Sequence, residues 1–240
     1  MTTRQRVKAR SLRPLLVGVI ASLADLRTAR RLRNPPDLFE IRLDYLHRDL
    51  NELENSLSVL AARSPLIITA RHPSEGGATK LSNSQRRELL LRFLPLASYM
   101  DVELRSVRPF APILSQARQR RIRCIISVHD FQSTPTVRNL GNKAHKAKKR
   151  GADIFKIATR TDSKDQLARL LEFFERHKID LAISAMGIGK LGRRSRRALL
   201  RMGSALNYAG LRSFRISGQP SLAEIRRWPK CSAGRSPKLG

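Results

Sequence analysis

The feature that most constrains the fold of this chain is a regular alternation between short apolar runs and segments with helical spacing. Eight apolar or β-branched runs can be placed, near Leu15–Ala21, Leu38–Tyr45, Leu66–Arg71, Tyr99–Leu104, Arg123–His129, Asp153–Thr159, Leu181–Met186 and Ala205–Ala209. Between them, apolar residues recur at helical intervals, as at Leu167, Leu170, Leu171 and Phe174. Strands that alternate with helices are typical of parallel sheets, because each helix returns the chain to the edge where the next strand starts.

Eight such units in 240 residues predict an α/β fold with a single (β/α)8 TIM barrel rather than an open, doubly wound sheet. We place the barrel at residues 15–228, between a basic N-terminal extension at 1–14 and a basic, disordered tail at 229–240. The extension contains no acidic residue, which is also a property of transit peptides. The pair Gly187-Ile-Gly189 follows a predicted strand, and we interpret it as a tight turn.

The chain is strongly basic, with 48 Lys and Arg residues against 19 Asp and Glu residues and a formal charge of +29. Such a charge attracts polyanions without any specific site. The basic residues lie largely in helical segments such as 143–150 and 193–201, which is typical of solvated outer faces. No aromatic residues interleave with these segments, so a stacking platform for single strands is not predicted. Nonspecific association with RNA or another polyanion remains an alternative function.

The cysteines and the hydropathy pattern exclude several other classes of protein. Cys124 and Cys231 are far apart in the sequence, and neither belongs to a Cys-x-x-Cys or Cys/His ligand pattern. Neither a disulfide framework nor a zinc site is predicted. No apolar run reaches 18 residues, so we expect a cytoplasmic protein without a membrane span.

Polar residues inside or directly after the predicted strands mark the candidate site, because the active site of a barrel lies at the carboxyl ends of its strands. Glu40 and Arg42 alternate within one run and therefore face the same side, and Arg71 ends the next run. His129 ends the fifth run and Lys156 lies within the sixth.

Lys156 interrupts the apolar stretch Asp-Ile-Phe-Lys-Ile-Ala, where an inward-facing ammonium is costly to bury. Burial and neighbouring cations would favour the neutral amine, which can attack a carbonyl group. His129 is suited to proton transfer near neutral pH. Glu75, in Ser-Glu-Gly-Gly, can orient a histidine, and Arg196, in Arg-Arg-Ser-Arg-Arg, can bind a carboxylate with its guanidinium fork. The alternatives are a lysine that reaches water, a structural histidine, a loop glutamate and a surface arginine.

Taken together, these segments resemble the type I 3-dehydroquinate dehydratases from about Leu15 to Ile225. The matching pieces follow the family order: Glu40-Ile-Arg-Leu-Asp44, Thr69-Ala-Arg71, Glu75-Gly-Gly77, Asp101-Val-Glu-Leu104, Ile126-Ser-Val-His-Asp-Phe131, Thr134-Pro135, Phe155-Lys-Ile-Ala158, Ser184-Ala-Met-Gly187, Ser195-Arg196, Gly203-Ser-Ala-Leu206 and Gly218-Gln219. The resemblance implies a homodimeric lyase of the shikimate pathway that removes water from 3-dehydroquinate, without metal or organic cofactor.

The resemblance also implies a role for each site residue. Lys156 would form an imine with the C3 ketone, while His129 would move the protons and Glu75 would orient His129. The residues implied to line the substrate pocket are Glu40, Arg42, Arg71, Met186, Arg196, Ser217 and Gln219. Arg196 would pair with the substrate carboxylate.

Two departures from the family pattern fall near the end of the chain. Arg215 stands where the family has a substrate-binding serine, and we assign that role to Ser217 instead. The segment between Met186 and Ser195 is about two residues longer than in the family, which leaves Arg193, Arg194 and Arg196 as candidates for one position. We choose Arg196 because it follows a serine. A class I aldolase, which shares a strand lysine, is a second alternative, although the set of His129, Glu75 and Arg196 argues against it.

Overall fold

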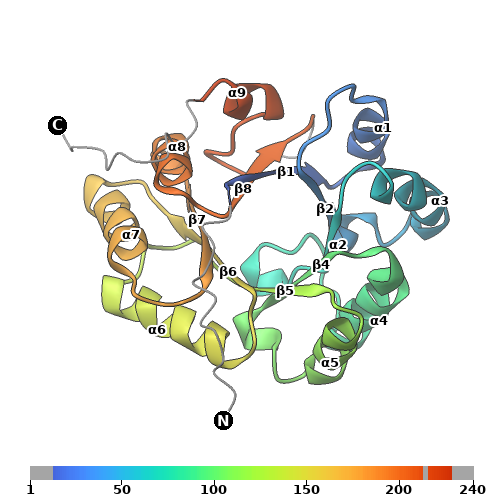
Figure 1. Ribbon diagram of the computed structural model, residues 1–240, viewed down its shortest axis with the longest axis horizontal. Coiled ribbons are helices and arrows are strands. Elements are labelled where there is room, and N and C mark those ends of the chain that lie inside the picture. The colour runs from blue at the N-terminus through green and yellow to red at the C-terminus, as the bar shows by residue number, and fades with distance from the viewer. Residues whose placement is uncertain (1–12, 213–215, 229–240) are drawn as a thin grey trace, which may run out of the picture.

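The computed structural model describes residues 13–212 and 216–228, and it confirms the predicted (β/α)8 TIM barrel (Figure 1). Eight parallel strands form one sheet in the order β7-β6-β5-β4-β3-β2-β1-β8. The strands are β1 Leu15–Ile20, β2 Leu38–Arg42, β3 Leu66–Thr69, β4 Tyr99–Glu103, β5 Arg123–Asp130, β6 Ile154–Arg160, β7 Ala182–Ile188 and β8 Leu206–Gly210.

Helices form a ring around the strands (Figure 1). They are α1 Leu23–Arg31, α2 Leu43–Leu46, α3 Leu50–Ala61, α4 Asn83–Phe93, α5 Ala111–Gln119, α6 Val137–Lys149, α7 Lys164–Arg176, α8 Gly192–Met202 and α9 Leu222–Arg226, with 3-10 turns at Pro73–Glu75, Leu94–Leu96 and Leu104–Ser106. Ser82 and Ser163 begin α4 and α7 with capping boxes, in which side chains satisfy the free N–H groups of the first turn.

The ends of the sheet, β7 and β8, are joined across a seam by backbone and serine hydrogen bonds. The backbone N–H of Ala205 donates to the carbonyl of Ile183 at 2.9 Å. Ser204 accepts from the N–H of Ala185 at 3.0 Å through its Oγ, and this hydroxyl lies 3.2 Å from the Ala185 carbonyl. At the seam, buried serine side chains therefore supply the backbone hydrogen-bond partners that a neighbouring strand provides elsewhere in the sheet.

Two apolar layers hold the barrel together. The larger one lies between strands and helices and includes the fully buried Phe39, Phe93 and Phe155. The smaller one fills the barrel interior and is made of side chains such as Leu38 and Ile154. Because side chains alternate along a strand, every second residue of a strand faces the interior of the barrel.

The strand boundaries differ from expectation by one or two residues, and by more at β2. The run Leu38–Tyr45 was predicted to be extended throughout, but β2 ends at Arg42 and Leu43–Leu46 forms α2. The predicted extension at 1–14 and tail at 229–240 lie outside the described residues, except for positions 13 and 14. Within the described ranges, Cys124 is buried, and no helix is long and apolar enough to cross a membrane.

The seam predicts a stability effect. Ser204→Ala should lower the free energy of unfolding by about 1–3 kcal/mol, because it leaves the buried N–H of Ala185 without a partner. The measurement is urea unfolding followed by circular dichroism. Ser58→Ala, at an exposed position of α3, should change stability by no more than about 0.5 kcal/mol. Equal losses in the two variants would contradict this account of the seam.

Candidate active site

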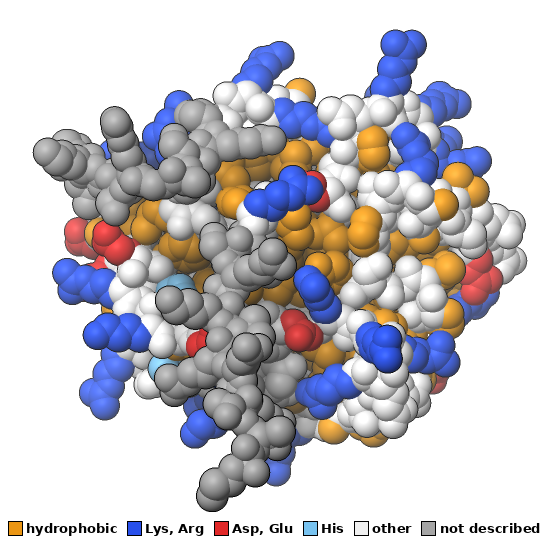
Figure 2. Space-filling model, in the orientation of Figure 1, with side chains coloured by type: hydrophobic (Ala, Val, Ile, Leu, Met, Phe, Trp, Pro, Cys, Tyr) orange, Lys and Arg blue, Asp and Glu red, His pale blue; other side chains and the backbone are white. Residues whose placement is uncertain are grey.

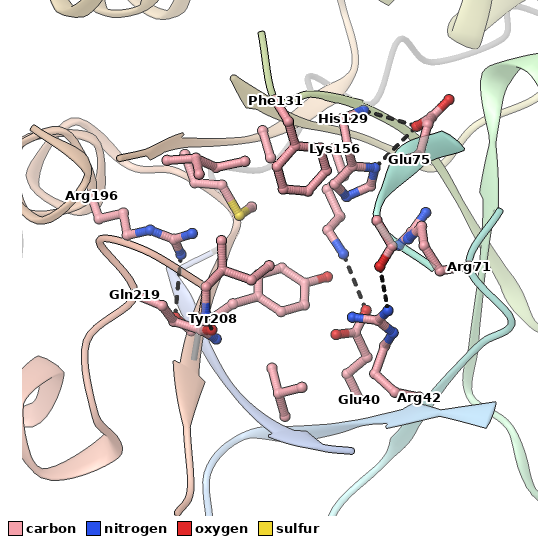
Figure 3. Close-up of a pocket in the computed structure, with 16 residues that line it drawn as sticks. Glu40, Arg42, Arg71, Glu75, His129, Phe131, Lys156, Arg196, Tyr208 and Gln219 are labelled. Carbon is pink, nitrogen blue, oxygen red and sulfur yellow. Dashed lines mark hydrogen bonds and ion pairs between the residues drawn. The ribbon is translucent and has the colours of Figure 1, made fainter. Parts of the chain in front are cut away.

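Most of the polar residues predicted to form a site converge on one pocket inside the barrel (Figure 3). It is lined by Val19, Glu40, Arg42, Arg71, Glu75, Gly76, His129, Phe131, Lys156, Ala158, Met186, Ile188, Arg196, Tyr208, Ile216 and Gln219. Most of these residues lie in the later part of a strand or in the loop that follows it. The pocket therefore opens at the carboxyl ends of the strands, as expected for a barrel enzyme.

The amine of Lys156 is buried in this pocket between two carboxylates. Its Nζ atom lies 2.9 Å from an Asp101 oxygen. It also lies 3.1 Å from a Glu40 oxygen (Figure 3). It also lies 4.0 Å from the centre of the Tyr208 ring, within the range of a cation–π contact. The groups that contact the amine are therefore anionic or aromatic, and the nearby cation Arg71 binds the same carboxylate, Asp101.

A buried network of ion pairs surrounds Asp101. Arg71 donates to both oxygens of Asp101, at 3.1 and 2.9 Å, and to Glu103 at 3.0 Å. Burial would raise the pKa of Asp101, but the charges of Arg71 and Lys156 outweigh it and hold that pKa below its ordinary value. Glu103 is also paired with Arg86, so each carboxylate of this group has cationic partners.

His129 and Glu75 form a second pair, at the rim of the pocket. One Glu75 oxygen accepts from the backbone N–H of His129 at 2.9 Å and lies 3.1 Å from its Nδ1 atom. Burial, together with the charges of Arg71 and Lys156, holds the pKa of His129 well below its ordinary value. Burial raises the pKa of Glu75 to about 7. The imidazole is therefore neutral near pH 7, with Nε2 left to face the pocket.

Arg42 holds the loop that carries Glu75. Its guanidinium binds Asp44 with two hydrogen bonds, at 2.9 and 2.8 Å, and donates to the Gly76 carbonyl at 3.1 Å. Gly76 has a φ of +83°, and a Cβ atom there would lie 2.7 Å from the ring of Phe131. Only glycine fits this position, because the left-handed conformation and the close ring both exclude a side chain.

Arg196 is buried, but its hydrogen bonds go to backbone carbonyls. The guanidinium donates to the carbonyls of Gly187, at 3.0 Å, and Tyr208, at 3.4 Å. Within residues 13–212 and 216–228, no carboxylate lies within ion-pair distance of it. Burial lowers the pKa of Arg196 to about 10, which still leaves it charged at neutral pH. A buried cation without an anionic partner is a strong candidate for binding an anionic ligand group.

Comparisons with known proteins agree with this geometry. Residues 19–234 match the family model for type I 3-dehydroquinase. This chain belongs to the type I 3-dehydroquinase family. It is 34% identical over 193 residues to a 3-dehydroquinate dehydratase of Thermodesulfovibrio yellowstonii, covering 79% of this chain and 82% of that one.

Further relatives and a solved structure carry the same enzyme name. A 3-dehydroquinate dehydratase of Thermococcus gammatolerans is 33% identical over 217 residues, covering 89% of this chain and 96% of that protein. A bifunctional chloroplastic protein of Arabidopsis thaliana, a 3-dehydroquinate dehydratase/shikimate dehydrogenase, is 33% identical over 194 residues, which are 79% of this chain and 32% of that protein. The crystal structure of 3-dehydroquinate dehydratase from Geobacillus kaustophilus superposes with a TM-score of 0.81 at 25% identity, covering 89% of this chain and 88% of that one.

In this type I 3-dehydroquinase, the structure separates the candidate arginines. Arg196 lines the pocket, whereas Arg193 is exposed and pairs with Glu224 at 3.3 Å, and Arg194 is also exposed. Met186 and Gln219 lie in the pocket wall, as expected. Ser217 does not, because its side chain is exposed and Ile216 occupies the wall instead. Arg215 lies outside the described residues.

Three glycines from the end of β7 to the start of α8 have a packing role in this 3-dehydroquinase. Gly187, Gly189 and Gly192 show the spacing Gly-x-Gly-x-x-Gly between a strand and a helix, a pattern often linked to dinucleotides. A Cβ atom on Gly187 would lie 2.1 Å from the hydroxyl of Ser195, and one on Gly192 would lie 2.9 Å from the Cα of Gly218. The spacing therefore allows close packing of α8 against the strand and the neighbouring loop.

Three groups at the site of the 3-dehydroquinase were not assigned from the sequence: Phe131 and Tyr208, which line the pocket, and Asp101, which lies behind Lys156. In the sequence, Asp101 stood out only as part of a family motif, although it contacts Lys156. Tyr208 could have been found from its spacing, since it lies two residues after the inward-facing Leu206 on the same strand. Across the described part of the chain, no three His, Cys, Asp or Glu side chains are arranged to hold a metal ion.

The His129–Glu75 pair predicts an unusual titration. The carboxyl of Glu75 should take up a proton as the pH falls through about 7 and be ionised only above that value, because burial penalises its charge. The measurement is carbon NMR of protein labelled at glutamate carboxyl groups. Glu54 provides an internal control, because its hydrogen bond from Arg92 lowers its pKa. The step near pH 7 should vanish in Glu75→Gln, and its persistence there would refute the assignment.

Proposed function

We propose that this protein removes water from 3-dehydroquinate to give 3-dehydroshikimate, through an imine on Lys156. The observation that carries the proposal is a buried primary amine in a barrel pocket. The same pocket holds a histidine–carboxylate pair and an arginine that has no anionic partner among the described residues. These three groups match the needs of a substrate with a ketone, an acidic carbon–hydrogen bond and a carboxylate. The family names support the same activity.

In the first step, Nζ of Lys156, once deprotonated, attacks the C3 carbonyl, and the oxygen leaves as water. The product is a protonated imine whose positive charge lies beside Asp101 and Glu40, at the position that the ammonium holds in the free protein. This charge draws electrons toward nitrogen, so the C2 hydrogen becomes far more acidic than it is beside a ketone. Loss of that proton leaves an enamine.

His129 carries the protons of the elimination. Its neutral imidazole accepts the C2 proton, and the resulting imidazolium delivers it to the C1 hydroxyl as the enamine electrons expel that group as water. Glu75, which contacts Nδ1, orients the ring and stabilises its charged form. Hydrolysis of the imine then consumes one water, releases the ketone and restores Lys156, so the net change is the loss of one water.

The remaining pocket residues bind and orient the substrate. Arg196 would bind the carboxylate on C1, because its fork geometry suits a carboxylate and its charge has no other anionic partner within the described ranges. We assign contacts with the ring hydroxyls to Glu40, Arg42, Arg71 and Gln219, and an apolar contact to Met186. Ile216, rather than Ser217, would close the wall beside the ring.

This reaction belongs to the shikimate pathway, which leads to the aromatic amino acids. The name of the Arabidopsis relative joins the dehydratase to a shikimate dehydrogenase. We propose that the protein acts in the cytoplasm as a homodimer, on the strength of the family resemblance. We place the barrel at residues 15–228, between the basic extension and the tail.

The basic surface suggests a second property, nonspecific association with polyanions. Exposed cations follow one another along α6 and α8, including Lys149, Arg194 and Arg201. Figure 2 shows Lys and Arg side chains projecting around the rim of the face in view. Such binding would depend on counterion release and would weaken steeply with salt.

The decisive test of the proposed function is the removal of the amine. Lys156→Ala should lower dehydration of 3-dehydroquinate roughly 1,000-fold or more, measured as growth of ultraviolet absorbance from the conjugated enone. Lys156→Arg is the matched variant, because it keeps a cation beside Asp101 and Glu40 but cannot form the imine. Substantial turnover by a folded Lys156→Arg protein would overturn the imine mechanism.

Two controls separate this proposal from its rivals. Borohydride should trap 3-dehydroquinate on the unaltered protein, and trapping only with aldol substrates would indicate a class I aldolase instead. Binding of heparin should be the same in Lys156→Ala as in the unaltered protein and should fall with rising salt. Heparin binding without any dehydration by folded, unaltered protein would favour the polyanion-binding alternative.

The two arginines of α8 provide a prediction about substrate binding. Arg196→Ala should raise KM about tenfold to a hundredfold, because it removes a charge-assisted contact with the substrate carboxylate. Arg193→Ala should change KM by less than about twofold, since this side chain is 57% exposed and pairs with Glu224 outside the pocket. Steady-state kinetics measure both, and equal effects would refute the assignment of Arg196.

A further inference from the structure

The pocket contains one polar group to which neither the family resemblance nor the mechanism above gives a task, the hydroxyl of Tyr208. The side chain comes from β8, lines the pocket and is only 4% exposed. Its oxygen is fully buried and has no hydrogen-bond partner among the residues that the structure describes. Figure 3 shows the ring in the middle of the pocket, with its hydroxyl end directed away from β8.

A buried hydroxyl without a partner is destabilising, because it has lost its hydrogen bonds to water. A phenylalanine would fill the same space without this cost and would keep the ring against Lys156. The hydroxyl therefore weakens the fold slightly in return for a polar group beside the reactive amine. Buried polar groups of this kind are accounted for when a ligand supplies the missing partner.

We infer that the Tyr208 hydroxyl binds the substrate directly, through the hydroxyl group on C4. This inference rests on the proposed function, because the position of C4 follows from the bond between Lys156 and C3. The centre of the Tyr208 ring lies 4.0 Å from Nζ of Lys156, so a carbon held by that nitrogen lies close to the ring. His129 and Tyr208 approach Lys156 from different sides (Figure 3).

The two neighbours of C3 then take opposite places. C2 faces His129, which removes its proton, and C4, with its hydroxyl, faces Tyr208. Burial, with the nearby carboxylates of Glu40 and Asp101, raises the pKa of Tyr208 well above its ordinary value. The phenol therefore stays neutral and keeps a proton to donate to the C4 oxygen.

Tyr208→Phe tests the inference, because it removes the hydroxyl alone. We expect kcat/KM for 3-dehydroquinate to fall about tenfold, mainly through KM, as one hydrogen bond to the substrate is lost. The unfolding midpoint in urea should stay the same or rise, since the hydroxyl has no partner within the described residues. A structural role would instead lower that midpoint and leave KM unchanged.

Tyr99→Phe is the matched control. Tyr99 also belongs to the apolar layer inside the barrel, but its hydroxyl accepts from Arg123 at 3.1 Å and does not line the pocket. Its loss should lower stability and leave KM unchanged. Tyr208→Phe should therefore raise KM without lowering stability, whereas Tyr99→Phe should lower stability without raising KM.

An analogue of 3-dehydroquinate with hydrogen in place of the C4 hydroxyl identifies the contact. For the unaltered protein, kcat/KM should be about tenfold lower on this analogue than on 3-dehydroquinate. For Tyr208→Phe, kcat/KM should be nearly the same on the two compounds. Equal losses in both proteins would overturn the inference about C4. Turnover that is unaffected by Tyr208→Phe would also overturn it, whereas a lack of turnover by the unaltered protein would overturn the proposed function itself.

Discussion

The contact on which the rest of the structure depends is that of Asp101 with two buried cations, Arg71 and Lys156. A charge inside a barrel is strongly destabilising unless an opposite charge lies beside it, so the amine, the guanidinium and the carboxylate need one another. The network also reaches the loop that carries Glu75, because Glu103 binds Arg71 and accepts from the backbone N–H of His72 at 2.9 Å. The ion pairs therefore position both Lys156 and the loop that carries Glu75.

The barrel separates this charged region from an apolar one by the two-residue period of its strands. Along β6, the inward-facing residue after Ile154 is Lys156, and along β8 the one after Leu206 is Tyr208. The apolar side chains nearer the starts of the strands fill the interior, while polar side chains further along face the pocket. On the same strand, the residue that packs in the barrel interior and the residue that lines the pocket are thus neighbouring inward-facing positions.

The guanidinium of Arg196 and the hydroxyl of Tyr208 are two pocket groups whose binding capacity the described residues do not fully use. Arg196 has no anionic partner among them, and the Tyr208 hydroxyl has no hydrogen-bond partner among them. Both lie buried, where an unused charge or donor lowers stability, and the proposed substrate would supply the missing partners. Arg196 suits a carboxylate and Tyr208 suits a hydroxyl. Together with Lys156, they would hold a ring at three points around its perimeter, which orients C2 toward His129.

The sequence by itself determined the alternation of eight strands with helices and the prominence of Lys156 and His129, because these depend on patterns within a few neighbouring residues. Only the tertiary structure decided that carboxylates contact Lys156, that Arg196 faces the pocket and that Ile216 replaces Ser217 in its wall. The physical reason is distance along the chain. Glu40 and Lys156 are 116 residues apart and meet only because the sheet curves into a barrel, and no local pattern encodes such a meeting.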